Sequence, residues 1–165
     1  MTRLDALLTE LHNSPRVDED DWELKRKDWL QDLEMLFDQV ERWLARGIED
    51  GDLKTRRREM ELDEPDLGPY RAPALDIYVK RKGSRLIRVE PRGMSIVGVI
   101  PRPGHRVVGA QGRVDWICGP RRAILLRSGG GKWHFVETDR PFTSGEVAPE
   151  LSEDSLADVL GDLFG

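Results

Sequence analysis

Residues that bind metal ions through nitrogen or sulfur are few and widely separated in this sequence. The chain has three histidines, His12, His105 and His134, and a single cysteine, Cys118. Zinc sites need several such ligands at short, characteristic spacings. A single cysteine also cannot form a disulfide within the chain. We therefore expect no zinc site and no cofactor, and we interpret Cys118 as a small buried residue of a strand.

A glycine-rich run also lacks the residues that its chemistry would require. Gly129, Gly130, Gly131 and Lys132 resemble the end of a phosphate-binding loop, but Leu126 stands where its first glycine belongs and Trp133 where Ser or Thr would bind magnesium. A strand is predicted to follow, where that motif needs a helix. We interpret the run as a hairpin loop. Gly-x-Ser-x-Gly is absent as well, so no nucleophile is indicated.

Two carboxylates give the most specific hypothesis for an enzyme. Asp76 and Glu90 are two of the three acidic residues between positions 70 and 132. Asp76 followed by Glu90-Pro91-Arg92 resembles the Asp…Glu-x-Lys arrangement of the PD-(D/E)xK nucleases. The resemblance implies carboxylates that bind magnesium and a lysine that assists the attacking water. It departs from the pattern at Arg92, which replaces the lysine, and at Pro91. The alternative is that both acids form structural ion pairs with arginines.

Charge divides the chain into three blocks. Residues 1–69 have 11 Lys/Arg against 20 Asp/Glu, residues 70–132 have 14 against 3, and residues 133–165 have 1 against 8. A basic middle block suits phosphate contacts, and Tyr78, Trp116 or Trp133 could stack on bases. The candidate nucleic-acid contacts are the basic residues of one hairpin: Arg81, Lys82, Arg85, Arg88 and Arg92. The alternative is that acidic helices cover this block and neutralise it.

A second short basic run precedes these. Arg56, Arg57 and Arg58 lie next to several acids. We interpret them as part of a charged turn or an edge strand, where charge discourages pairing between sheets.

A long amphipathic helix is predicted from the acidic run at residues 18–21 to about Gly47. Negative residues favour a helix start, and the apolar residues form a wide stripe rather than a narrow coiled-coil seam. The stripe either packs on the protein's own core or binds a partner. The residues that would form the partner interface are Trp22, Trp29, Phe37 and Trp43.

Alternating residues and turn signals predict a mostly antiparallel sheet of about five to seven strands from residue 53. We expect strands at residues 75–80, 85–90, 94–100, 105–110, 113–118, 122–127 and 132–137. The strand at 94–100 should be central because it is apolar on both faces. The strand at 113–118 should be half exposed. A turn is expected at residues 91–93, and the boundary between helical and sheet regions at 63–69.

Two shorter helices complete the expected architecture. Leu4, Leu7, Leu8 and Leu11 have helical spacing and would pair with the long helix as a helical hairpin. A C-terminal helix should begin at Ser152 as N-cap. The chain is therefore expected to be one α+β domain, with a helical part at residues 1–52, an antiparallel sheet at 53–148 and a helix at 149–165.

The expected function is binding of another macromolecule without catalysis, through a protein partner or self-association. Nucleic-acid binding by the arginine-rich sheet is the first alternative, and a nuclease using Asp76 and Glu90 is the second. No export signal and no membrane-spanning run are visible, so a cytoplasmic location is expected.

Overall fold

A computed structural model describes residues 2–13, 19–65, 67–80, 83–94, 111–128, 131–137 and 150–164. For residues 19–21 and 137 only the backbone is described. The elements are α1 (Arg3–Asn13), α2 (Glu19–Glu49), β1 (Leu53–Glu64), β2 (Gly68–Val79), β3 (Arg85–Gly93), β4 (Arg113–Cys118), β5 (Arg121–Arg127), β6 (Trp133–Glu137) and α3 (Glu153–Phe164). The predicted α+β class is confirmed.

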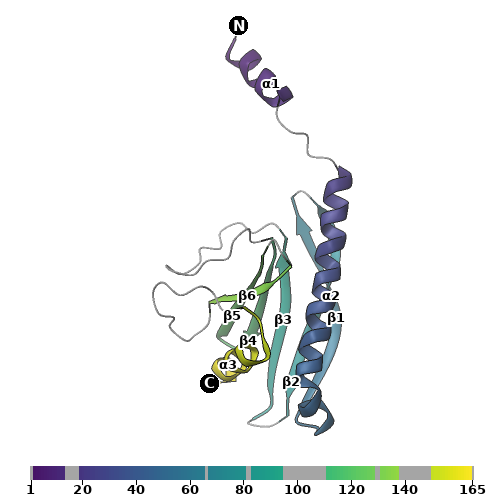
Figure 1. Ribbon diagram of the computed structural model, residues 1–165, viewed down its shortest axis with the longest axis vertical. Coiled ribbons are helices and arrows are strands. Elements are labelled where there is room, and N and C mark those ends of the chain that lie inside the picture. The colour runs from purple at the N-terminus through teal and green to yellow at the C-terminus, as the bar shows by residue number, and fades with distance from the viewer. Residues whose placement is uncertain are drawn as a thin grey trace.

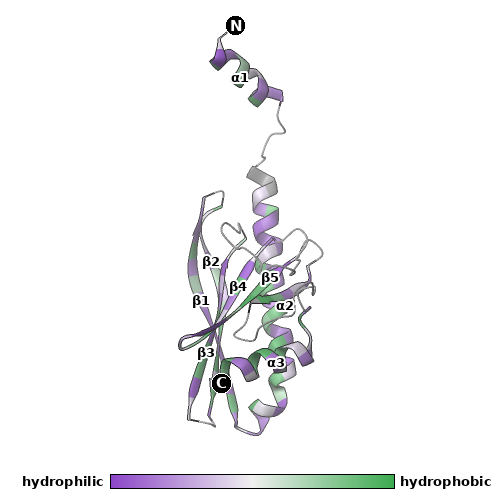
Figure 2. Ribbon diagram, turned by 90° about the vertical axis from the view of Figure 1, so that its left-hand side faces the viewer, coloured by the Kyte–Doolittle hydropathy of each residue, from purple (hydrophilic) through white to green (hydrophobic). Residues whose placement is uncertain are grey.

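The six described strands form one sheet in the order β1-β2-β3-β4-β5-β6, and each pairs with the next in antiparallel register. Helices α2 and α3 lie on the same side of this sheet (Figures 1 and 2). One apolar core joins them to it. Trp29 and Phe37 of α2, Trp116 of β4, Phe135 of β6 and Leu156 of α3 all belong to this core and are almost fully buried.

The two short helices begin as their sequences indicate. In α1 the backbone N–H of Asp5 donates to the Thr2 hydroxyl, and the N–H of Thr2 donates back to the Asp5 carboxylate. In α3 the N–H of Ser155 donates to the hydroxyl of Ser152, which confirms Ser152 as the N-cap. These bonds satisfy N–H groups that a first helical turn leaves without partners.

Helix α1 does not pack against α2 as the helical hairpin that we expected. None of its residues is buried. Figure 1 shows it apart from the sheet. Its leucine face, Leu4, Leu7, Leu8 and Leu11, is at least half exposed. Among the described helices, none has the length and apolar character needed to cross a bilayer.

The expected boundary at residues 63–69 is wrong, because β1 and β2 pair as a hairpin across this segment, with Asp63 opposite Pro69 and Glu64 opposite Gly68. The N–H of Leu67 donates to the carbonyl of Glu64, and Gly68 has a φ of 67°. A positive φ is easiest for glycine, which lacks a Cβ atom. The proline and glycine signals therefore mark a turn within the sheet.

The expected turn at residues 91–93 is also wrong, since β3 continues through them to Gly93. The register against β4 shifts between Pro91 and Gly93, and Gly93 has a φ of 143°. A proline is tolerated at such an irregularity because the ladder loses its regular N–H there. The strand β4 is buried on both faces instead of half exposed, with Asp115 and Ile117 almost covered. The strands predicted at 94–100 and 105–110 lie outside the described residues, apart from buried Met94.

Candidate functional site

The sheet has an outer face, opposite α2 and α3, where charged side chains gather. Antiparallel register aligns five residues across this face, one from each of the strands β1 to β5. Residues that pair directly across strands point to the same face. The row is formed by Arg56, Asp76, Arg88, Ile117 and Arg122. The alternate positions, such as Leu75, Ile87 and Trp116, belong to the apolar core beneath the helices.

Arg58 joins the two carboxylates that resembled a nuclease pair. Its Nε lies 3.1 Å from Oδ1 of Asp76, and its Nη2 lies 3.1 Å from Oε2 of Glu90. The acids are largely buried, with side chains 10% and 12% exposed. Burial lowers the pKa of Arg58, but the hydrogen bonds and negative charge of Asp76 and Glu90 outweigh it, so the pKa is raised. One guanidinium therefore binds both carboxylates and offsets one of their two negative charges.

Asp115, the third acid of the basic block, is held in the same way. Its carboxylate accepts hydrogen bonds from Arg92 at 3.0 Å and from Arg113 at 2.7 Å, while Arg122 lies 4.0 Å away. Within the described ranges, no three His, Cys, Asp or Glu side chains gather in a way that could hold a metal ion. Asp76, Glu90 and Asp115 are thus all bound by arginines. Ion pairs with arginines are what the structural alternative to a nuclease site predicts for Asp76 and Glu90.

Three further cations of the outer face form no ion pair with a described residue. Lys54, Arg56 and Arg88 are exposed and form no ion pair or hydrogen bond through their side chains with any described residue. Lys54 and Arg56 line a cavity of about 340 Å³ at the end of strands β1 to β3. Such volumes fall within the range of about 300–1,000 Å³ of small-ligand pockets.

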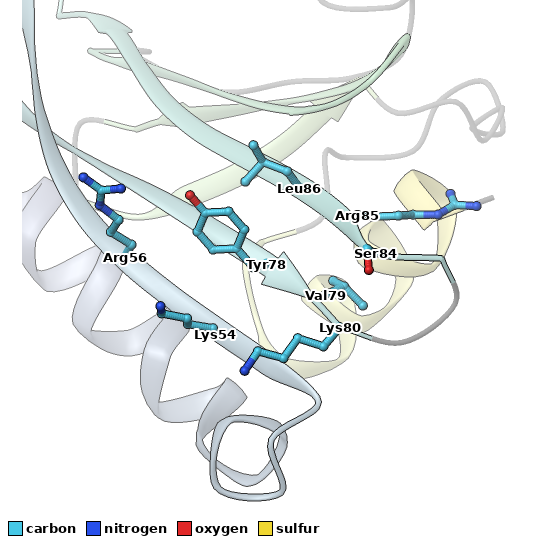
Figure 3. Close-up of a pocket in the computed structure, with 8 residues that line it drawn as sticks. All are labelled: Lys54, Arg56, Tyr78, Val79, Lys80, Ser84, Arg85 and Leu86. Carbon is cyan, nitrogen blue, oxygen red and sulfur yellow. The ribbon is translucent and has the colours of Figure 1, made fainter.

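Tyr78 lies at the centre of this cavity, as Figure 3 shows, with Arg56 and Lys54 on one side and Leu86 on the other. Tyr78 is half-buried, and Leu86 stands directly opposite it on β3. The side chain of Lys80 also borders the cavity. The site thus combines an aromatic ring and an apolar side chain with several cations, which suits a ligand that has both a flat apolar part and negative charge.

The five candidate nucleic-acid contacts are not all available. Arg81 and Lys82 lie outside the described residues. Arg92 is committed to Asp115, and Arg85 lines the cavity but donates to the backbone carbonyl of Phe164 at the end of α3. Arg88 is exposed on the outer face and has no described partner.

The four candidate partner-interface residues belong to the core or its edge. Trp29 and Phe37 have no exposed surface, so they cannot contact a partner while the protein is folded. Trp22 and Trp43 are partly buried and pack against the same core. The tryptophan stripe therefore packs on the protein's own sheet, which was the first of the two alternatives.

Sequence reasoning did not select Lys54 and Arg56 as site residues. Arg56 was seen only as part of a run of three arginines, and β1 is indeed an edge strand. Alternation along a strand could have separated that run, because neighbouring side chains point to opposite faces. Of the three aromatic residues considered for stacking, Trp116 and Trp133 are buried and Tyr78 remains partly exposed.

Comparison with known proteins finds no matching family model, no matching curated protein and no matching solved structure. The site must therefore be interpreted from its own geometry.

Proposed function

We propose that the protein binds nucleic acid through the outer face of strands β1 to β3. One observation carries this proposal: Lys54, Arg56 and Arg88 are exposed on that face without an ion-pair partner among the described residues. Cations that already have acidic partners, such as Arg58, offer a ligand little additional attraction. Cations without partners attract phosphates and release the counterions bound to them.

The spacing of these cations suits a chain of regularly placed charges. Lys54 and Arg56 are two residues apart on one strand, which separates them by about 7 Å. Arg56 and Arg88 lie in one row on either side of Asp76, two strands apart, which corresponds to about 10 Å. A repeating polyanion can therefore contact several of them together.

The acidic residues of helices α2 and α3 also support binding of nucleic acid on the outer face. Helix α2 has 10 Asp/Glu against 5 Lys/Arg, and α3 has 4 Asp/Glu and no basic residue. Both helices cover the other side of the sheet (Figure 2). They therefore leave the described cations of the outer face uncovered. Such polarity steers an anionic ligand to one face of a protein whose net charge is -5.

A fluorescence-anisotropy titration tests the proposal. A labelled oligonucleotide of about 12 nucleotides, single-stranded or paired with its complement, matches the size of typical single-strand sites. At about 50 mM salt we expect saturable binding that weakens steeply by about 200 mM. The double variant Arg56→Ala/Arg88→Ala should reduce the slope of log K against log salt by about 1.5, at roughly 0.7–0.9 for each lost phosphate contact.

The matched control removes two exposed cations from elsewhere. Arg46 lies in the last turn of α2, and Lys132 borders a different cavity, between α2 and β6. Arg46→Ala/Lys132→Ala changes the net charge equally and should bind like the wild type. Equal losses for both double variants would mean that net charge alone drives binding, and no binding at low salt would refute the proposal.

Self-association through α1 is a second candidate function, favoured by the exposed leucine face of this helix. Leu24 and Met35 of α2 are about 60% exposed and eleven residues apart. Eleven residues make three helical turns, so both lie on one side of α2 and about 16 Å apart. Helix α1 has 11 residues and the same length. The leucine face of one copy thus matches the Leu24–Met35 strip of a second copy.

Analytical ultracentrifugation of the full chain tests this candidate. We expect a dimer whose fraction rises with concentration and disappears in Leu7→Glu/Leu8→Glu. The control Ala6→Glu/Thr9→Glu adds the same charge to exposed residues on the opposite side of α1 and should still dimerise. A wild type that is monomeric at every concentration would refute self-association.

A further inference from the structure

The cavity around Tyr78 has a composition that a phosphate-binding surface alone does not need. Phosphates require cations and N–H groups, whereas three of the eight residues that line this cavity are aromatic or apolar: Tyr78, Val79 and Leu86. The Tyr78 ring is partly exposed, and Leu86, the residue opposite it on β3, is 39% exposed. Exposed apolar side chains in a charged surface favour a ligand with an apolar face.

We propose that this cavity holds one unpaired base, so that the preferred ligand is a single strand. This inference rests on the proposed nucleic-acid binding of the outer face. The base stacks on Tyr78 and contacts Leu86, while Lys54, Arg56 and Lys80 contact the phosphates that precede and follow this base along the strand. In a duplex the bases are stacked inside the helix and present only their edges, so the Tyr78 ring has no base face to stack on.

The placement of the cations around the ring supports this assignment. Figure 3 shows Arg56, Lys54 and Lys80 along one side of Tyr78 and Leu86 on the other. A base that stacks on the ring thus has cations along one side, where the sugar-phosphate backbone of the nucleic acid would pass. The cavity volume of about 340 Å³ admits a ligand of small-molecule size and not a helix or a folded domain.

The other two aromatic residues considered for stacking are buried. Trp116 is fully covered, and Trp133 is 8% exposed and packs against Trp29 at a ring distance of 6.0 Å. The tryptophans of α2 pack in or against the core. Of the three residues considered for stacking, Tyr78 is therefore the one placed to stack on a base, beside cations that form no ion pair with a described residue.

The experiment compares single-stranded and duplex DNA of equal length, single-stranded RNA and heparin by anisotropy or competition. The wild type should bind single strands about tenfold more tightly than duplex, in keeping with stacking of one base. Tyr78→Ala should lose this preference and bind single strands and duplex equally. Tyr78→Phe should retain it, because stacking needs the ring and not the hydroxyl. RNA and DNA single strands should bind alike.

A second variant covers the case in which Tyr78→Ala fails to fold. Leu86→Ser removes the apolar contact at an exposed position, and we expect it to weaken single-strand binding about threefold without affecting the duplex. Folding of each variant is checked by circular dichroism and thermal melting.

The outcomes separate this inference from the proposal on which it rests. Equal affinity of the wild type for single strands and duplex, or an unchanged preference in Tyr78→Ala, would overturn the base pocket and leave phosphate binding intact. Wild type and Tyr78→Ala should bind heparin equally, and a loss of heparin binding in Tyr78→Ala would overturn the base pocket, because heparin has charge but no bases. No binding to any nucleic acid would overturn the proposed function itself.

Discussion

Removal of the Arg58 side chain should destabilise the protein far more than removal of Arg56, two residues away on the same strand and face. Arg58→Ala leaves the carboxylates of Asp76 and Glu90 without their guanidinium in an environment that is about 90% buried. Arg56 has no partner among the described residues. The two variants make the same chemical change and differ only in what the guanidinium contacts.

The size of the effect follows from these contacts. Loss of one partner of a buried ion pair costs about 3–5 kcal/mol, and each hydrogen bond to a charged group contributes about 1.5–3 kcal/mol. Arg58 is 28% exposed, so water can partly replace it. We therefore expect a loss of about 2–4 kcal/mol for Arg58→Ala. Arg56→Ala should stay within about 0.5 kcal/mol of the wild type.

Urea denaturation followed by tryptophan fluorescence measures both variants, and thermal melting should show a fall on the order of 10 °C for Arg58→Ala. In the Arg58→Ala background, Asp76→Asn should recover about 1 kcal/mol or more, because it removes one unpaired charge. Equal stability of Arg58→Ala and Arg56→Ala would refute the argument that Arg58 stabilises a buried pair of acids.

Three further predictions concern the core and the acids. Trp29→Ala should cost about 3–5 kcal/mol in urea denaturation, because Trp29 is fully buried and donates a hydrogen bond to Tyr70; a stable variant would mean that α2 is not held by this ring. Burial and the hydrogen bond to Glu64 raise the pKa of Tyr70 above its usual 10.0, so the folded state favours the neutral phenol. The free energy of unfolding should therefore fall as the pH rises above 10. Tyr70→Phe should be less stable than the wild type at pH 8 by about 1–3 kcal/mol, but its stability should fall less above pH 10. Parallel pH profiles of stability for the two proteins would contradict this. Magnesium should leave the melting temperature of the wild type unchanged, since the guanidinium of Arg58 already occupies oxygens of Asp76 and Glu90 that a metal ion would need, and a clear rise on titration would support the nuclease alternative.

Local pattern was sufficient to predict much of the fold. The strand Arg113–Cys118 has the bounds that alternation and its flanking turns indicate, and α2 extends two residues beyond the expected Gly47. These elements are recognisable because apolar residues recur at the period of the structure they form. The burial of Trp29 and Phe37 agrees with the width of the stripe, which is typical of a helix on a globular core.

Features that depend on contacts between distant residues were not predictable in this way. Half-exposure of β4 was expected because its apolar residues alternate with Arg113, Asp115 and Ile117, yet Arg92 and Arg113 bind the carboxylate of Asp115. The turn at residues 91–93 was expected because proline and glycine usually end a strand, but here they lie at an irregularity inside one. In each case a neighbouring strand is involved, since Arg92 of β3 binds Asp115 and the irregularity at Pro91 is defined by its pairing with β4, and no local pattern reports such a contact.

The three consecutive arginines of β1 also differ in their contacts in a way that local sequence does not predict. Arg57 points towards α2 and forms ion pairs of 2.6–2.8 Å with Glu34, Asp38 and Glu41. Arg58 points to the outer face and binds buried acids, while Arg56, on that same face, is opposite Asp76 but forms no ion pair with any described residue. A count of basic residues gives all three equal weight. Two of them stabilise the fold, and the third is available to a ligand, so the number of unpaired cations on a face, rather than the charge of a segment, indicates where a polyanion binds.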